Sequence, residues 1–121
     1  TEFCDMRLAY EALSSEEQAR LAPLKARHPT LHSRKLTGFT DWSEEALSRL
    51  GWVDRPLIGC HEATGRRTLA LASHISELSG YSEEESAPLL RALTERATAP
   101  ENCYSHRWRE GDFLLWDNRC V

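Results

Sequence analysis

The segment CYSHRWREGDFLLWDNRCV, residues 103–121, carries the clearest signal for the fold. Its two halves, Cys103–Trp108 and Phe113–Asp117, are strand-like, and the second is strongly apolar. Glu110-Gly111-Asp112 separates them, and a Gly-containing turn between two such runs is typical of a β-hairpin. The sequence therefore predicts an antiparallel hairpin close to the end of the chain.

The segment immediately before this hairpin predicts a helix over Ser82–Ala97. Ser82 and Glu85 have the spacing of a capping box, which satisfies free backbone N–H groups at a helix N-terminus. Pro88 disturbs the first turns and makes Ser86 an alternative start. The residues at inward-facing positions are Ser86, Leu89, Leu90, Leu93 and Ala97.

Two strands are predicted further upstream, at Pro56–His61 and Arg67–Ala72. Residues 62–66 connect them and contain Gly65, so this segment is expected to form a hairpin turn.

The first half of the chain is mainly helical in pattern, after a short strand in TEFCD. Residues 6–13 place apolar side chains on one helical face. A second helix is expected from Ser14 to about Arg27, with Pro23 as a kink, followed by a loop over 28–39. A short helix is expected from Ser43 to Gly51. The pattern as a whole predicts a mixed α/β fold.

Composition excludes several classes of protein. The chain has 121 residues, which suits one domain or part of one. A net charge of −4 argues against a nucleic-acid-binding surface, and no apolar run approaches the roughly 20 residues that cross a bilayer. Four scattered cysteines without a CxxC pair favour free thiols in a reducing cytoplasm. We expect a soluble cytoplasmic protein that binds neither nucleic acid nor membrane.

Both ends of the sequence resemble the interior of a domain. The chain starts without Met in a strand-like segment and stops in the apolar segment that ends at Val121. Natural domain termini are usually polar and loosely held. We therefore expect residues 1–121 to be one interior fragment of a larger domain.

Spacing alone identifies no active site. His28 and His32 are four residues apart, but Pro29 makes a helical metal site improbable, so both are expected in a solvated loop. Cys103 and His106 lack a second pair that would complete a zinc site. No G-x-S-x-G or Gly-rich phosphate loop occurs, and no histidine is followed two positions later by Asp or Glu. No metal ligand and no catalytic residue is assigned within the chain.

Four segments, in order, resemble the taurine/2,4-dichlorophenoxyacetate dioxygenase family. They are TEFCDMRLAYEAL (1–13), HEATGRRTLAL (61–71), SHISELSGYSEEESAPLLRALTERAT (73–98) and HRWREGDFLLWDNRCV (106–121). TEFCDM and WDNRCV are most similar to the 2,4-dichlorophenoxyacetate branch. Since the resemblance covers essentially the whole chain, it is more specific than any one motif.

The resemblance implies part of a jelly-roll (double-stranded β-helix) core with outer helices. It also implies Fe(II) and the co-substrate 2-oxoglutarate, with iron held by a His-x-Asp pair and a distant His. In the family the first pair precedes the segment that matches TEFCDM. The second His and an Arg that binds 2-oxoglutarate follow the segment that matches WDNRCV. Residues 1–121 would then be a partial dioxygenase domain without the metal-ligand segments.

The resemblance assigns roles to a few residues. Thr1 matches the Thr whose hydroxyl binds 2-oxoglutarate, although a frayed terminal Thr is an alternative. His74 lies in the stretch that lines the substrate pocket, and a hydrogen-bonded structural His is equally compatible. Trp108 and Trp116 match aromatic positions near the iron, with core packing as the alternative. Residues 117–119 match a polar triplet that supports the strand delivering the distal His.

The implied activity is hydroxylation and cleavage of phenoxyacetate-type ethers, which converts 2,4-dichlorophenoxyacetate to a phenol and glyoxylate. The partners are a small carboxylate substrate, 2-oxoglutarate and oxygen. One alternative is a 2-oxoglutarate dioxygenase for taurine, another sulfonate or another carboxylate. An alternative from a different class is a catalytically dead jelly-roll domain that serves in binding, because the metal ligands are missing.

Overall fold

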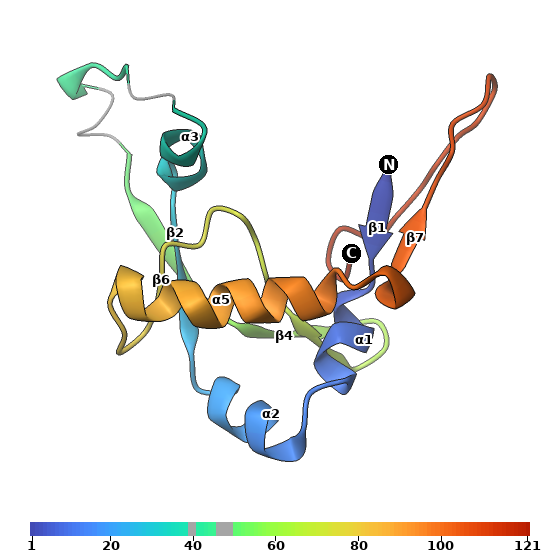
Figure 1. Ribbon diagram of the computed structural model, residues 1–121, viewed down its shortest axis with the longest axis horizontal. Coiled ribbons are helices and arrows are strands. Elements are labelled where there is room, and N and C mark those ends of the chain that lie inside the picture. The colour runs from blue at the N-terminus through green and yellow to red at the C-terminus, as the bar shows by residue number, and fades with distance from the viewer. Residues whose placement is uncertain (39–40, 46–49) are drawn as a thin grey trace.

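Two short helices follow the first strand in the computed structural model, which describes residues 1–38, 41–45 and 50–121 (Figure 1). Helix α1 (Met6–Glu11) starts at Asp5, whose side chain accepts a hydrogen bond from the backbone N–H of Arg7. Helix α2 (Ser15–Leu21) has the predicted capping box between Ser14 and Glu17. These caps satisfy N–H groups that have no acceptor within the helix, so the local sequence fixes where each helix begins.

Within the described residues, the strands form small antiparallel sheets. Strand β2 is the central strand of one sheet, with β3 and β6 on either side, whereas β4 pairs with β5, and β1 pairs with β7. The strands are β1 (Glu2–Cys4), β2 (Lys25–Pro29), β3 (Trp52–Pro56), β4 (Ile58–His61), β5 (Arg66–Leu69), β6 (Glu77–Leu78) and β7 (Cys103–Ser105).

The prediction of one helix from Ser14 to Arg27 was wrong. Helix α2 ends at Leu21, two residues before Pro23, and Lys25–Pro29 forms strand β2. Proline cannot donate the backbone hydrogen bond that would continue the helix. In β2 the side chains alternate, so that Ala26 is fully buried while Arg27 turns toward its partners on the other face.

Two further expectations for the first half also fail. Residues 28–39 are not a simple loop, because they contain the end of β2 and helix α3 (His32–Leu36). Strand β3 was not predicted at all, since all of its residues are exposed and charges interrupt it. The helix expected from Ser43 to Gly51 depends on residues 46–49, which lie outside the described part of the chain.

The C-terminal hairpin was predicted correctly at its turn and incorrectly in its pairing. The backbone N–H of Asp112 donates to the carbonyl of Arg109, and Gly111 has a φ of +86°. However, β7 spans only Cys103–Ser105, and it pairs with β1 instead of with residues 113–117. The resulting arm projects from the body of the protein (Figure 1).

The pairing of β1 with β7 also overturns the prediction that all four cysteines are free. Cys4 lies directly opposite Cys103, with Cα atoms 4.4 Å apart, and the two form a disulfide. Directly opposed residues in an antiparallel ladder approach this closely where no hydrogen bonds join them. Cys60 and Cys120 are free thiols, exposed and buried respectively.

The β4–β5 hairpin and the long helix confirm the predictions for the centre of the chain. Gly65 has a φ of +70°, and its N–H donates to the carbonyl of His61. Helix α5 (Glu83–Ala97) has the expected capping box at Ser82 and runs through Pro88 without a later start. In Figure 1 it crosses the molecule from β6 to the neighbourhood of α1.

Apolar side chains from α1, α2, α5 and strands β2, β4, β5 and β6 meet in one core. Leu57, between β3 and β4, is fully buried, and its N–H donates to the carbonyl of Leu24. The other buried members are Ala9, Leu13, Leu21, Ala26, Ile58, Leu69, Ile75, Leu78, Leu93 and Ala97.

The described residues thus have mixed α and β content in small sheets, and they do not by themselves form a closed jelly roll. Large apolar side chains of the arm remain exposed, including Phe113 and Leu115, at 87% and 84%. Within the same residues, no helix is long and apolar enough to cross a bilayer.

One hydrogen bond inside this core provides a test of the fold. Ser86, 1% exposed, accepts from the backbone N–H of Leu78 at 2.9 Å and so joins α5 to β6. Ser86→Ala should lower the free energy of unfolding by about 1–3 kcal/mol, because a buried donor loses its acceptor. Urea denaturation measures the change, with Ser73→Ala at an exposed position as control. Equal stability of the two variants would contradict this role for Ser86.

Candidate functional site

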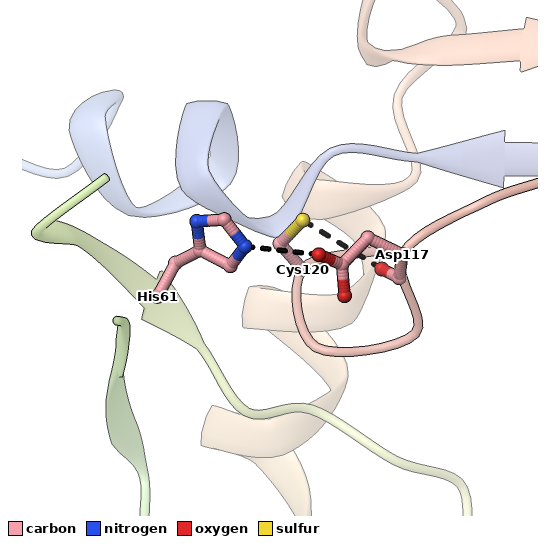
Figure 2. Close-up of side chains that lie close together, drawn as sticks. All are labelled: His61, Asp117 and Cys120. Atoms are coloured by element: carbon pink, nitrogen blue, oxygen red, sulfur yellow. Dashed lines mark hydrogen bonds and ion pairs between the residues drawn. The ribbon is translucent and has the colours of Figure 1, made fainter. Parts of the chain in front are cut away.

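A buried histidine at the end of β4 organises the most extensive polar cluster near the C-terminus. Nε2 of His61 lies 3.0 Å from Oδ2 of Asp117 (Figure 2). Nδ1 lies 2.7 Å from the hydroxyl of Thr64. Because a carboxylate only accepts, Nε2–H donates to Asp117, and Nδ1 shares a hydrogen bond with the Thr64 hydroxyl. Both ring nitrogens therefore have a hydrogen-bond partner.

Asp117 in turn holds the C-terminal loop in shape. Its carboxylate accepts from Nη2 of Arg119 at 2.7 Å, from Nε at 2.9 Å and from the backbone N–H of Arg119 at 3.0 Å. These bonds from Arg119, followed by the bond from His61, hold the pKa of Asp117 well below its usual range. The N–H of Met6 donates to the carbonyl of Cys120, which fixes the loop to α1. The predicted turn-supporting role of residues 117–119 agrees with this geometry.

His61, Asp117 and Cys120 are also the candidate metal ligands among the described residues. Their ligand atoms lie within 4.8 Å of one another. However, the iron site of this type of oxygenase needs two His and one carboxylate. The cluster has one His, and its carboxylate already binds Arg119 and His61. It does not fit Fe(II) in that chemistry, and hydrogen bonding accounts for the arrangement.

Thr1 lies at the base of the arm, beside β7. Its carbonyl accepts from the N–H of His106 at 2.7 Å, and its hydroxyl oxygen accepts from Nε1 of Trp108 at 2.8 Å. Since the indole N–H can only donate, the hydroxyl proton of Thr1 is free to donate to another group. Thr1 is thus anchored, and the alternative of a frayed terminus does not describe it.

The contacts of His106 were not predicted from the sequence. Nε2 of His106 lies 3.0 Å from Oδ2 of Asp112, and its ring meets Trp108 edge-on at 4.8 Å. The hydroxyl of Tyr104 lies 3.2 Å from Nδ1. The period-two spacing of Tyr104, His106 and Trp108 is the signal that places them on one side of an extended chain. Trp108 and Trp116 are both more than half exposed within residues 1–121.

His74 is exposed, and its ring packs against that of His28 with centroids 4.9 Å apart and an angle of 54° between the ring planes. His28 is therefore not the solvated loop residue that was predicted. Its Nε2 is buried, and no described residue hydrogen bonds to it. Burial, followed by the neighbouring His74 and Arg55, lowers the pKa of His28. His32 also differs from its prediction, since it lies in α3 with its Nδ1 3.9 Å from a carboxylate oxygen of Glu83.

Two open cavities lie against this histidine pair. One, of about 390 Å³, is bounded by β5, the residues that follow it and the C-terminal loop; the other, of about 530 Å³, lies beside β2, β3 and α3. His28 and Arg55 line both, whereas His74 lines the second. No Asp or Glu lines either cavity. Thr1 lines neither cavity. The structure therefore does not bring Thr1 and His74, the two predicted site residues, together in one cavity.

Comparison with known proteins identifies the family. The model of the family described as taurine catabolism dioxygenase TauD, TfdA family, matches residues 1–121, the entire chain. The chain belongs to this family, which confirms the resemblance seen in the sequence.

The chain is also similar to individual members of known sequence or structure. The chain is 46% identical to the alpha-ketoglutarate-dependent 2,4-dichlorophenoxyacetate dioxygenase of Cupriavidus pinatubonensis, over all of this chain and 42% of that protein. Among solved structures, AAD-2 in complex with Mn(II) and N-oxalylglycine is 38% identical with a TM-score of 0.84. A putative alpha-ketoglutarate-dependent 2,4-D dioxygenase from Burkholderia xenovorans is 37% identical with a TM-score of 0.83. Each structural match covers 89% of this chain and 42% of the other.

The chain therefore spans about two fifths of the length of the relatives it matches. The whole-chain matches to dioxygenases agree with the reaction class that the sequence suggested.

The Asp117 network predicts a pH dependence of stability. The pKa of Asp117 is lowered in the folded protein, so its contribution is present above the unfolded value near 3.8 and is lost as the pH falls further. Asp117→Asn should lower the urea midpoint at pH 7, and the difference from the unchanged protein should shrink below about pH 3.8.

Asp41→Asn, at an exposed aspartate, provides the control and should leave the midpoint unchanged at both pH values. A difference between Asp117→Asn and the unchanged protein that is the same at pH 7 and pH 3 would show that the charge of Asp117 is not responsible.

Proposed function

We propose that this chain is part of an Fe(II)- and 2-oxoglutarate-dependent dioxygenase that hydroxylates and cleaves phenoxyacetate-type ethers. The observation that carries the proposal is 46% identity, over the whole chain, to a 2,4-dichlorophenoxyacetate dioxygenase. In net terms a phenoxyacetate, 2-oxoglutarate and O₂ give a phenol, glyoxylate, succinate and CO₂. Hydroxylation of the carbon beside the ether oxygen yields a hemiacetal, which collapses to the phenol and glyoxylate.

The metal ligands of this enzyme are proposed to lie outside residues 1–121. The described residues offer no set of two His and one carboxylate around a common point. Residues 1–121 would then be one part of a jelly-roll domain, with the remaining strands covering the exposed arm. The exposed side chains of Phe113 and Leu115, and the backbone of residues 113–117, which belongs to no strand, support this view. The expected location remains the cytoplasm.

Thr1 is proposed to bind the 2-oxoglutarate carboxylate. The hydrogen bond from Trp108 occupies the hydroxyl oxygen of Thr1 as an acceptor and leaves its proton for a carboxylate. A hydroxyl that donates to a carboxylate forms a charge-assisted bond, stronger than one between neutral groups.

His74 is proposed to contact the acidic substrate. It is exposed at the rim of the 530 Å³ cavity, and no carboxylate lines that cavity. A structural histidine would be expected to have a hydrogen-bond partner, and no described residue makes a hydrogen bond to the ring of His74. This observation favours the substrate role over the structural alternative.

The substrate distinguishes the proposal from its alternatives. The full-length protein, supplied with Fe(II), 2-oxoglutarate and O₂, should release a phenol and glyoxylate from phenoxyacetate, because the ether-bound carbon is activated for hydroxylation. Colorimetric detection of phenol measures the reaction, and residues 1–121 alone should give no turnover above a metal-only blank.

If the protein releases sulfite from taurine but no phenol from phenoxyacetate, it belongs to the sulfonate branch of the family instead. Absence of any 2-oxoglutarate consumption by the full-length protein would favour a catalytically dead binding domain.

The role of Thr1 can be separated from that of the substrate site. Thr1→Ala in the full-length protein should raise the KM for 2-oxoglutarate about tenfold, through loss of about 1.5 kcal/mol of carboxylate binding. The KM for phenoxyacetate should change much less. Thr1→Ser, which keeps the hydroxyl, should restore most of the affinity, and equal effects on both KM values would contradict the assignment.

A further inference from the structure

We propose that Arg55, on the face of the central sheet that carries His28, binds the carboxylate of the substrate. This inference rests on the proposed function and adds a residue that determines specificity. Neither the spacing of the sequence nor its resemblance to the family pointed to Arg55.

The strand register places Arg55 and His28 on the same face. Arg55 lies opposite Ala26, and His28 lies opposite Val53, so these four side chains alternate onto one side of the β2–β3 pair. Ala26 is fully buried. This face thus meets the core at Ala26, whereas Arg55 and Val53 are exposed, and Arg55 and His28 line the cavities beside it.

On the opposite face of the central sheet, Arg27 is paired with acidic side chains. Arg27 contacts Asp54 at 3.0 Å and Glu77 at 2.5 Å, and its guanidinium lies 5.0 Å from the centre of the Trp52 ring. The acidic residues of the central sheet, Asp54 in β3 and Glu77 in β6, are thus both paired with Arg27. Among the described residues, the guanidinium of Arg55 makes no ion pair or hydrogen bond, although the chain carries a net charge of −4.

The cavities are positive in a protein that is negative as a whole. Arg34, Arg55, His28 and His74 line the 530 Å³ cavity together with uncharged residues. Arg34 lies 6.0 Å from the ring centre of Trp42, which leaves Arg55 as the guanidinium with no partner on this surface of the described chain. An unpaired guanidinium in cavities that no Asp or Glu lines is well suited to an anionic ligand.

The 390 Å³ cavity places apolar side chains beside the same guanidinium of Arg55. Arg55 and His28 also line the 390 Å³ cavity, whose other residues include Met6, Leu71 and Ala72. A ligand with a carboxylate at one end and an apolar body at the other satisfies both parts of the lining. The planar fork of the guanidinium matches the two oxygens of a carboxylate, and the buried, unpartnered Nε2 of His28 lies close to the same place.

Kinetics of the full-length protein provide the first test. Arg55→Gln should raise the KM for phenoxyacetate at least tenfold and leave the KM for 2-oxoglutarate within about twofold, because the lost contact concerns one carboxylate only. Arg55→Lys, which keeps the charge without the fork, should be intermediate. Arg20→Gln, at an exposed arginine of α2 outside both cavities, is the matched control and should change neither value.

Binding measured without oxygen provides the second test. Calorimetry should show that Arg55→Gln weakens binding of phenoxyacetate at least tenfold and leaves the neutral phenoxyacetamide unaffected. Equal losses for both ligands, or equal increases of both KM values, would overturn the proposal and give Arg55 a structural role.

The two tests also separate this inference from the proposed function. If phenol release is the same in Arg55→Gln as in the unchanged protein, the inference is overturned and the proposed function stands. Binding of phenoxyacetate that depends on Arg55, in a protein that releases no phenol, would support the anion site and reject the reaction. A protein that binds no phenoxyacetate at all would overturn both.

Discussion

The antiparallel pairing of β1 with β7 is the constraint on which the candidate site depends. It joins residues about a hundred positions apart, with Cys4 opposite Cys103 at a sequence separation of 99. The same register places the carbonyl of Thr1 on the N–H of His106 and the hydroxyl of Thr1 on Trp108. A shift by one residue would turn every side chain of β1 to the other face and separate Thr1 from Trp108.

Two further hydrogen bonds hold the C-terminal loop against α1 and the β4–β5 hairpin. The bond from Met6 to Cys120 and the His61–Asp117 pair reach the loop from two directions. The loop then forms one wall of the cavity that Arg55 and His28 share. The two faces of β2 also differ in charge. Arg27 is paired with acidic residues on the outer face, and no acidic residue lies on the inner face.

Local signals predicted those parts of the fold that depend on local chemistry. The capping boxes at Ser14 and Ser82, and the left-handed conformation of Gly65, are each determined by a few neighbouring residues. Strands β2 and β3 escaped prediction because their stability comes from pairing across 20 or more residues of chain, and their outer side chains are charged. The pairing of β7 with β1 is longer in range still.

The same distinction applies to the site. The resemblance to a family singled out Thr1 and His74, and the structure gives each an environment compatible with its proposed role. Arg55 was invisible in the sequence, because nothing in its local pattern shows which face of an unpredicted strand it occupies. His28 was misjudged for the same reason, since its burial follows from β2 and not from its neighbours in the sequence.

The β1–β7 pairing must also hold in the compartment where the protein is proposed to act. In a reducing cytoplasm the thiols of Cys4 and Cys103 stay reduced, and the pairing then depends on contacts that need no sulfur. The ladder itself provides these, together with the bonds between Thr1 and His106 and the packing of Phe3 on Trp116 at 5.2 Å. Because Thr1 is held through its backbone and through Trp108, its hydroxyl keeps its orientation whether or not the disulfide forms.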